Sequence, residues 1–117
     1  MSDLTMPALV FGATGDPLEV LQWEERPAPR RVSGSVLIDV IARPIHPADH
    51  AFIRGRYRIQ PQFPQIAGLE GAGVIRESSD SEEFTVGQRV AFRWPGSWAG
   101  ISGCAGRAAH RRSGRRG

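Results

Sequence analysis

A glycine-rich segment in the middle of the chain places the strongest constraint on its fold. Residues 63–75 read FPQIAGLEGAGVI, with Gly68, Gly71 and Gly73 inside six positions. A dinucleotide cradle requires G-x-G-x-x-G between a strand and a long helix, so that backbone N–H groups meet the phosphates. Here the order is G-x-x-G-x-G, and β-branched residues follow it. The segment therefore predicts a tight turn and a close approach of two backbones, rather than phosphate binding.

The other local patterns predict short strands joined by turns. We expect strands at residues 7–11, 18–24, 36–45, 70–78 and 89–94, separated by stretches rich in proline and glycine. Apolar residues fall on both sides of the strand at 36–41, which indicates that both of its faces are at least partly covered. One short helix should begin at Pro47 and end at Gly55. The chain is therefore predicted to form a mainly β, barrel-like fold.

Size and composition restrict the class of protein. With 117 residues, 40% of them hydrophobic, the chain is long enough for one small domain. It has no long apolar run that would predict a membrane span, and residues 1–10 lack the pattern of a secretory signal. The single cysteine, Cys104, cannot form an internal disulfide. We therefore expect a cytoplasmic protein that does not act at a membrane.

Charge is distributed unevenly along the chain. Residues 1–99 contain ten arginines and all twelve acidic residues, whereas residues 100–117 contain five arginines and no acid. A basic tail of this kind offers one alternative function, a small binding module that contacts nucleic acid or an acidic partner. The tail has no aromatic residue that could stack on bases, so nucleic acid is not the expected partner.

Several segments together resemble a known family. HPADHAFIRGRY, PQFPQIAGLEGAGVI, VGQRVAF and GSWA, in this order between about Pro7 and Ala99, are similar to the N-terminal catalytic domain of medium-chain dehydrogenases/reductases. The resemblance implies a GroES-like, partly open β-barrel. It is strongest to the zinc-free quinone and enoyl-thioester reductases. These use NADPH or NADH to reduce a small enone, quinone or enoyl thioester.

The resemblance also implies roles for two residues. Tyr57 stands where enoyl-thioester reductases of this family carry a tyrosine that donates a proton or orients the thioester oxygen. His46 stands where zinc-free members often have Asn, close to the nicotinamide, and could hydrogen-bond the cofactor. The alternative for Tyr57 is a half-buried tyrosine at the mouth of the barrel, and for His46 a residue that caps the short helix. Trp94 and Trp98 could line the substrate cleft or serve only in packing.

Metal binding is not expected. Zinc-dependent relatives carry a cysteine where this chain has His46, and a histidine where it has Leu69, and a leucine cannot ligate zinc. His46 and His50 are four residues apart and could share a helical face. A structural role for both histidines is favoured over a metal pair.

The resemblance ends after Ala99. Residues 100–117 read GISGCAGRAAHRRSGRRG, with neither a helical nor a strand period, as expected for a disordered Arg/Gly-rich tail translated out of frame. We therefore divide the chain into a partial GroES-like domain at 1–99 and a tail at 100–117, with the dinucleotide-binding domain absent. Such a truncated chain is expected to be inactive alone and able to self-associate through exposed strand edges. A co-chaperonin-like structural role would rest on fold resemblance alone.

Overall fold

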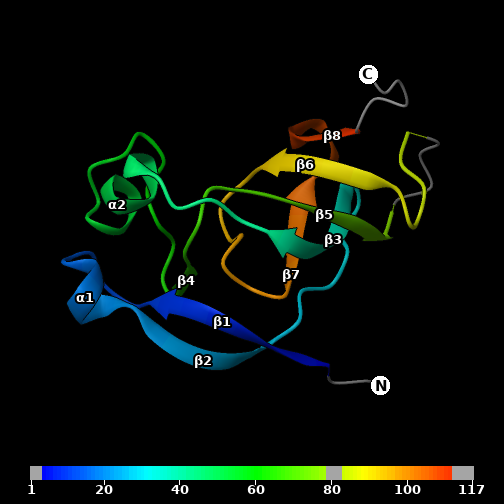
Figure 1. Cartoon of the computed structure of the whole chain (residues 1–117). Helices are drawn as coiled ribbons and strands as arrows, with labels where there is room; N and C mark the ends of the chain where they lie inside the picture. Colours follow the sequence, from blue (N-terminus) through cyan, green and yellow to red (C-terminus); the bar gives the residue numbers. More distant parts are fainter. Residues whose placement is uncertain (1–3, 79–82, 112–117) are drawn as a thin grey trace.

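The computed structural model describes residues 4–78 and 83–111 and shows two antiparallel sheets with two short helices at one end (Figure 1). The elements follow in the order β1 (Thr5–Phe11), α1 (Pro17–Val20), β2 (Gln22–Pro27), β3 (Ser35–Ala42), α2 (Pro47–Ile53), β4 (Gln65–Ile66), β5 (Glu70–Glu77), β6 (Arg89–Arg93), β7 (Ile101–Ala105), the 3₁₀ turn η1 (Gly106–Ala108) and β8 (Ala109–Arg111). Among these described residues, no helix is long and apolar enough to cross a bilayer.

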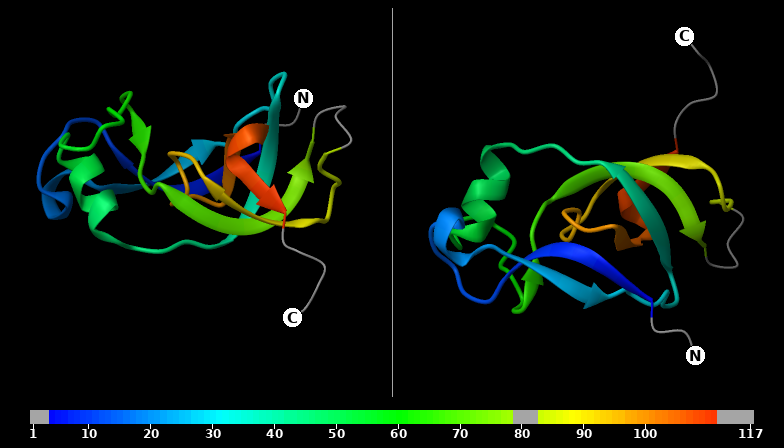
Figure 2. Two further views of the ribbon diagram at one scale, coloured as in Figure 1. Left: turned by 90° about the horizontal axis from the view of Figure 1, so that it is seen from above. Right: turned by 60° about the horizontal axis from the view of Figure 1, so that its bottom comes forward.

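The strands form a small sheet and a larger, curled one. The three-stranded sheet has the order β2-β1-β4, and the five-stranded sheet has the order β7-β3-β5-β6-β8. Figure 2 shows that the larger sheet curves around its inner face, so that the molecule resembles a barrel that is open on one side. The prediction of a mainly β, partly open barrel is confirmed.

Strand β3 contributes to the core on both of its faces. Val36 and Ile38 pack inside the curled sheet with Ile75, Phe92 and other residues. Leu37 points the other way, into the space between the two sheets. This alternation confirms the prediction of a strand covered on both faces, although it holds only for the first half of β3, because Ile41 is exposed.

The glycine-rich segment brings backbones together as predicted. Gly73 lies opposite Val40 in the β3–β5 ladder, and a Cβ atom at Gly73 would overlap the carbonyl oxygen of Asp39. Gly68 has a φ of +94°, a conformation that side-chain-bearing residues rarely adopt. These glycines therefore serve backbone packing, and the space that a phosphate would need is filled by protein atoms.

Two predicted element boundaries are wrong. Residues 18–24 were expected to form one strand, but α1 occupies Pro17–Val20 and β2 begins only at Gln22. The Asp16 carboxylate accepts a hydrogen bond from the Leu18 N–H (3.0 Å), and Pro17 suits the first helical position, so the segment is capped as a helix. The expectation of a single helix fails for the same reason. Strand β3 ends at Ala42 rather than residue 45, just before Pro44, which has no N–H for the ladder.

The predicted disordered tail is wrong for residues 101–111. Strand β7 pairs with β3 along Ile101–Ala105, and β8 pairs with β6. The hydrogen bonds between strands use backbone groups, which every residue here supplies. The small or apolar side chains of Ile101, Cys104 and Ala109 fit the core. Residues 101–111 can therefore form strands although their side chains follow no clear period. Residues 112–117 lie outside the described residues, and the out-of-frame origin of the tail stays a prediction.

The buried Cys104 thiol gives a prediction about pH. Burial raises the pKa of Cys104 from 9.0 to about 12, opposed in part by the nearby Arg107 charge. The unfolded chain loses this proton near pH 9, whereas the folded chain keeps it. The contribution of Cys104 to the free energy of unfolding should therefore be constant below pH 9 and fall as the pH rises toward 12.

Urea unfolding of the wild type and of Cys104→Ala at several pH values checks this prediction. The difference between the two proteins should decrease above pH 9, because only the wild type carries the thiol. A difference that stays constant up to pH 12 would contradict it.

Candidate active site

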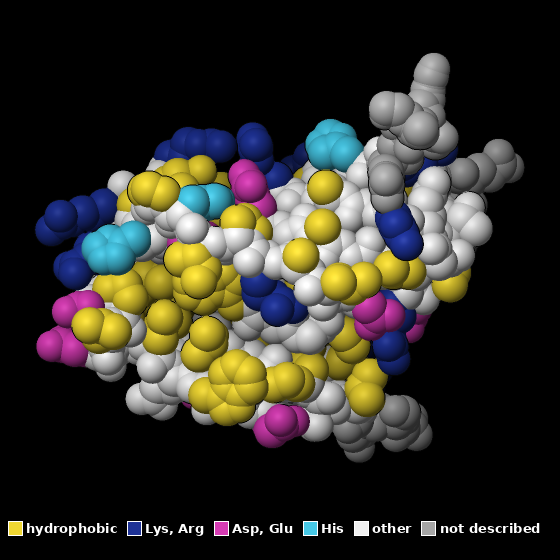
Figure 3. Space-filling model, viewed as in Figure 1, with side chains coloured by type: hydrophobic (Ala, Val, Ile, Leu, Met, Phe, Trp, Pro, Cys, Tyr) yellow, Lys and Arg dark blue, Asp and Glu magenta, His cyan; other side chains and the backbone are white. Residues whose placement is uncertain are grey.

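A cleft of about 530 Å³ opens between the start of α2, the loop after it, and the adjoining ends of β5 and β6. Its polar and aromatic lining includes His46, Tyr57, Arg58, Glu70, Arg93 and Trp94. Figure 3 shows basic side chains along the upper edge of this end of the molecule, above a broad group of apolar side chains. The cleft therefore combines an apolar setting with a few charged groups, as ligand sites commonly do.

His46 lies at the N-cap of α2, between two carboxylates. Its Nδ1 is 3.5 Å from Asp49 Oδ2, and its Nε2 is 3.7 Å from Glu70 Oε1. The side chain is 30% exposed and reaches the cleft. The structure thus places His46 at both positions considered for it, at the helix cap and on the cleft, and its role toward a cofactor stays a prediction.

Asp49 fixes the position of His46 and of the adjoining strand. Its carboxylate is buried and accepts hydrogen bonds from the His46 N–H (2.9 Å) and the Leu69 N–H (3.0 Å). Leu69 directly precedes β5, which begins with Glu70. One side chain therefore ties the start of α2 to the start of β5, and this supports a structural role for Asp49.

Tyr57 lies in the loop after α2 and faces the same cleft. Its ring meets Phe52 edge-on, with 6.5 Å between the ring centres, and it is half-buried. Among the described residues, its hydroxyl has no hydrogen-bond partner, so it is free to meet a ligand. The structure brings Tyr57 and His46 to one cleft, as their predicted roles require.

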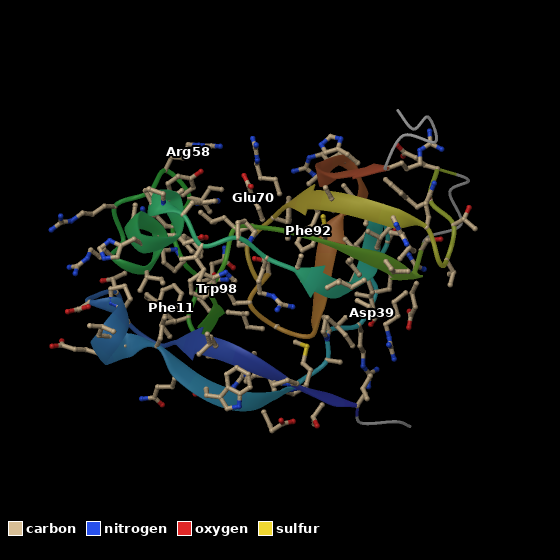
Figure 4. The ribbon with its side chains drawn as sticks, viewed as in Figure 1. Phe11, Asp39, Arg58, Glu70, Phe92 and Trp98 are labelled. Carbon is tan, nitrogen blue, oxygen red and sulfur yellow. The ribbon has the colours of Figure 1, made fainter. Side chains whose placement is uncertain are left out.

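Trp94 and Trp98 lie in different surroundings. Trp94 lines the cleft, and the guanidinium of Arg107 lies over its ring at 5.5 Å. Trp98 packs instead near Phe11 and donates its indole N–H to the Pro44 carbonyl (3.3 Å). Figure 4 shows Trp98 and Phe11 near α2 and β1, below Glu70 in this view. Of the two, Trp94 is the one that can contact a ligand in the cleft.

Three charged residues that line the cleft, Arg58, Glu70 and Arg93, were given no ligand role on the basis of the sequence. Arg93 Nε donates to Glu70 Oε2 (3.0 Å), and this pair follows from the register in which the two residues lie opposite each other on β5 and β6. Arg58 lies next to Tyr57, with its guanidinium carbon 5.6 Å from the ring centre. The register of β5 and β6 would have been the signal for the pairing of Glu70 with Arg93.

The described residues contain no group of three or more His, Cys, Asp or Glu side chains that could hold a metal ion. His50 is exposed, and its Nε2 accepts a hydrogen bond from Arg54 (3.3 Å). His46 is the N-cap and lines the cleft, so the rings of the two histidines have different neighbours. Leu69, at the position of a zinc ligand in related enzymes, is buried in the core.

Known proteins resemble this chain over most of its length. The mitochondrial enoyl-[acyl-carrier-protein] reductase of Xenopus tropicalis is 32% identical over 97 residues, which cover 83% of this chain and 25% of that protein. A Caenorhabditis elegans protein of the same name is 37% identical over 86 residues, which cover 73% of this chain and 25% of that protein. The chain thus spans about a quarter of the length of these relatives.

Solved structures share the fold. A Mesorhizobium loti protein assigned provisionally as an NADPH:quinone reductase is 32% identical, with a TM-score of 0.82, and the match covers 97% of this chain and 38% of that one. A Pseudomonas syringae quinone oxidoreductase is 23% identical, with a TM-score of 0.85 over 96% of this chain and 35% of that one. Residues 32–116 match the family described as the alcohol dehydrogenase GroES-like domain. The chain therefore belongs to the alcohol dehydrogenase GroES-like domain family, within the medium-chain dehydrogenases/reductases.

Proposed function

We propose that the chain carries the substrate cleft of an NADPH- or NADH-dependent, zinc-free reductase that acts on a quinone, an enone or an enoyl thioester. The observation that carries the proposal is the meeting of Tyr57 and His46 on one cleft. The names of the relatives, enoyl and quinone reductases, support the same substrate class.

The residues of the cleft suit the substrate half of such a reaction. A bound reduced nicotinamide supplies the hydride. Tyr57 can donate its phenolic proton to the carbon next to the carbonyl, or hydrogen-bond the carbonyl oxygen. His46 can hydrogen-bond polar groups of the cofactor next to its nicotinamide ring. The apolar lining residues Ile59 and Leu69 can pack against the carbon skeleton of such a substrate.

The glycine-rich segment is not suited to bind the phosphates of the cofactor. At Gly73 the space that a cradle would need is taken by the Asp39 carbonyl, and at Gly71 it is taken by the Phe92 ring. The glycines of β5 therefore leave no room for the cofactor's phosphates. We therefore propose that the 117-residue chain binds substrate and turns it over little or not at all.

The alternative of a basic binding module has less support. Arg107 stacks on Trp94, and Arg111 ends a strand of the sheet, so two of the five arginines of residues 100–117 belong to the fold. The other three lie outside the described residues.

Binding of crotonyl-coenzyme A and of 1,4-benzoquinone, followed by the fluorescence of Trp94, tests the proposal. Saturable quenching by one of the two ligands is expected in the wild type. Tyr57→Phe keeps the ring but removes one hydrogen bond, so it should weaken binding up to about tenfold, the equivalent of 0.5–1.5 kcal/mol. Trp94→Phe is the control that shows which tryptophan reports.

The outcome also separates binding from turnover. If neither ligand causes saturable quenching at millimolar concentration, the proposed substrate class is wrong. If added NADPH is oxidised at the ordinary enzymatic rate of about 1–10³ per second, the reductase assignment stands and the proposed inactivity of the chain is wrong.

A further inference from the structure

Within the described part of the chain, Arg58 is the cleft-lining arginine that has no carboxylate partner. Arg93 is paired with Glu70, and Arg54, outside the cleft, lies 3.8 Å from Asp16. Arg58 has no acidic partner among the described residues and lies over the Tyr57 ring instead. Figure 4 shows Arg58 and Glu70 on the same side of the molecule, with the Arg58 side chain at the surface. The cleft thus has an unbalanced positive charge next to its tyrosine.

The other polar groups near Tyr57 are already engaged within the protein. The Gln60 amide donates to the Tyr57 carbonyl (2.8 Å). Gln65 uses both ends of its amide, accepting from the Gln62 N–H (3.0 Å) and donating to the Ile66 carbonyl (2.8 Å). On this side of the cleft, the donors that remain available to a ligand among the described residues are therefore the Tyr57 hydroxyl, the Gln62 side-chain amide and the Arg58 guanidinium, and of these only Arg58 is charged.

We infer that Arg58 and Tyr57 together make the cleft a site for a delocalised oxyanion, and that it prefers conjugated ligands with an anionic oxygen over their neutral counterparts. The inference rests on the proposed function. A guanidinium and a phenol that both reach one ligand oxygen stabilise negative charge on it, because each can donate a hydrogen bond and the guanidinium adds its own charge.

This preference has a place in the proposed reaction. When a hydride adds to the β-carbon of an enone or enoyl thioester, the electron pair of the C=C bond moves into the carbonyl group and produces an enolate, while the nicotinamide is oxidised. The enolate then takes a proton at its α-carbon, from Tyr57 or from water. Arg58 would hold the enolate oxygen and so lower the barrier to hydride addition.

The inference can be tested by equilibrium binding, without cofactor and without turnover. The probe is 4-nitrophenolate, studied at a pH where the phenol is ionised, and its absorbance reports binding. The uncharged match is 4-nitroanisole, measured by competition. Wild-type protein should bind the anion about tenfold more tightly than the anisole, as expected for one charge-assisted hydrogen bond.

Two arginine variants identify the source of this preference. Arg58→Gln should reduce the anion-to-anisole ratio to near one. Arg56→Gln removes an exposed arginine two residues away that does not line the cleft, and it should leave the ratio unchanged. If Arg56→Gln lowers the ratio as much as Arg58→Gln does, the effect is general surface charge and the inference is wrong.

Further outcomes separate this inference from the proposed function. If both probes bind wild-type protein equally and Tyr57→Phe weakens both, the cleft binds ligands as proposed and the role of Arg58 is wrong. If crotonyl-coenzyme A binds but neither nitrophenyl probe does, the oxyanion preference is again wrong while the substrate class stands. A circular dichroism spectrum and a urea midpoint for each variant show that the fold is intact.

Discussion

A chain that ends at Gly100 should fail to fold cooperatively. The deletion removes β7, which covers one edge of β3, and β8, which pairs with β6. It also takes Ile101, Cys104 and Ala109 out of the core and exposes the apolar residues beneath them. Full burial of a single Ile side chain alone is worth about 1.5–3 kcal/mol. The total loss should exceed about 4 kcal/mol, a large part of the 5–15 kcal/mol that stabilises a typical domain.

The matched control is a chain that ends at Arg111, which keeps every described residue. Urea unfolding followed by tryptophan fluorescence should give a normal sigmoidal transition for this control. For the chain that ends at Gly100 we expect a shallow transition or none, together with a loss of amide signal dispersion in NMR spectra. If both chains unfold at the same urea concentration, strands β7 and β8 do not contribute to the stability of the fold.

The second large effect is expected at Gly73. In Gly73→Ala, the new methyl group would overlap the carbonyl oxygen of Asp39, which belongs to the backbone of the neighbouring strand. A backbone cannot rotate away as a side chain can, so β3 and β5 must separate at the centre of the five-stranded sheet. Overpacking usually costs about 1–3 kcal/mol, and this site should lie at or above the upper end of that range.

Gly12→Ala is the matched control for this substitution. A Cβ atom at Gly12 would have no neighbour within 4 Å, and the φ of Gly12 is not positive. Its free energy of unfolding should therefore change by no more than about 0.5 kcal/mol. Urea midpoints of the two variants, measured side by side, check the prediction. Equal midpoints would mean that the β3–β5 approach tolerates a methyl group.

The sequence predicted the fold most accurately where backbone geometry restricts the choice of residue. The glycine-rich segment required a close approach of strands, and Gly73 shows why, since no other residue fits there. Residues 101–111 were missed because their pairing depends on backbone hydrogen bonds with β3 and β6, and their own side chains show no clear period. The helix at Pro17–Val20 was missed because apolar residues nearby suggested a strand and outweighed the Asp16–Pro17 cap.

The candidate site was predicted only in part. Tyr57 and His46 were found through the family resemblance, and the structure places both on one cleft. The pairing of Glu70 with Arg93 depends on the register of β5 and β6, which a single sequence does not reveal. The uncompensated charge of Arg58 is visible only after every neighbouring acid has been placed. Positions of charged groups relative to one another are a property of the folded chain.

The buried carboxylate of Asp49 has a practical consequence for hydrogen exchange. The Leu69 amide proton is held by this carboxylate, and it can exchange with solvent only when α2 and the start of β5 move apart. Its exchange rate therefore measures how often this end of the barrel opens. One amide signal in an NMR spectrum can thus report on the integrity of the cleft, in the presence or absence of any ligand.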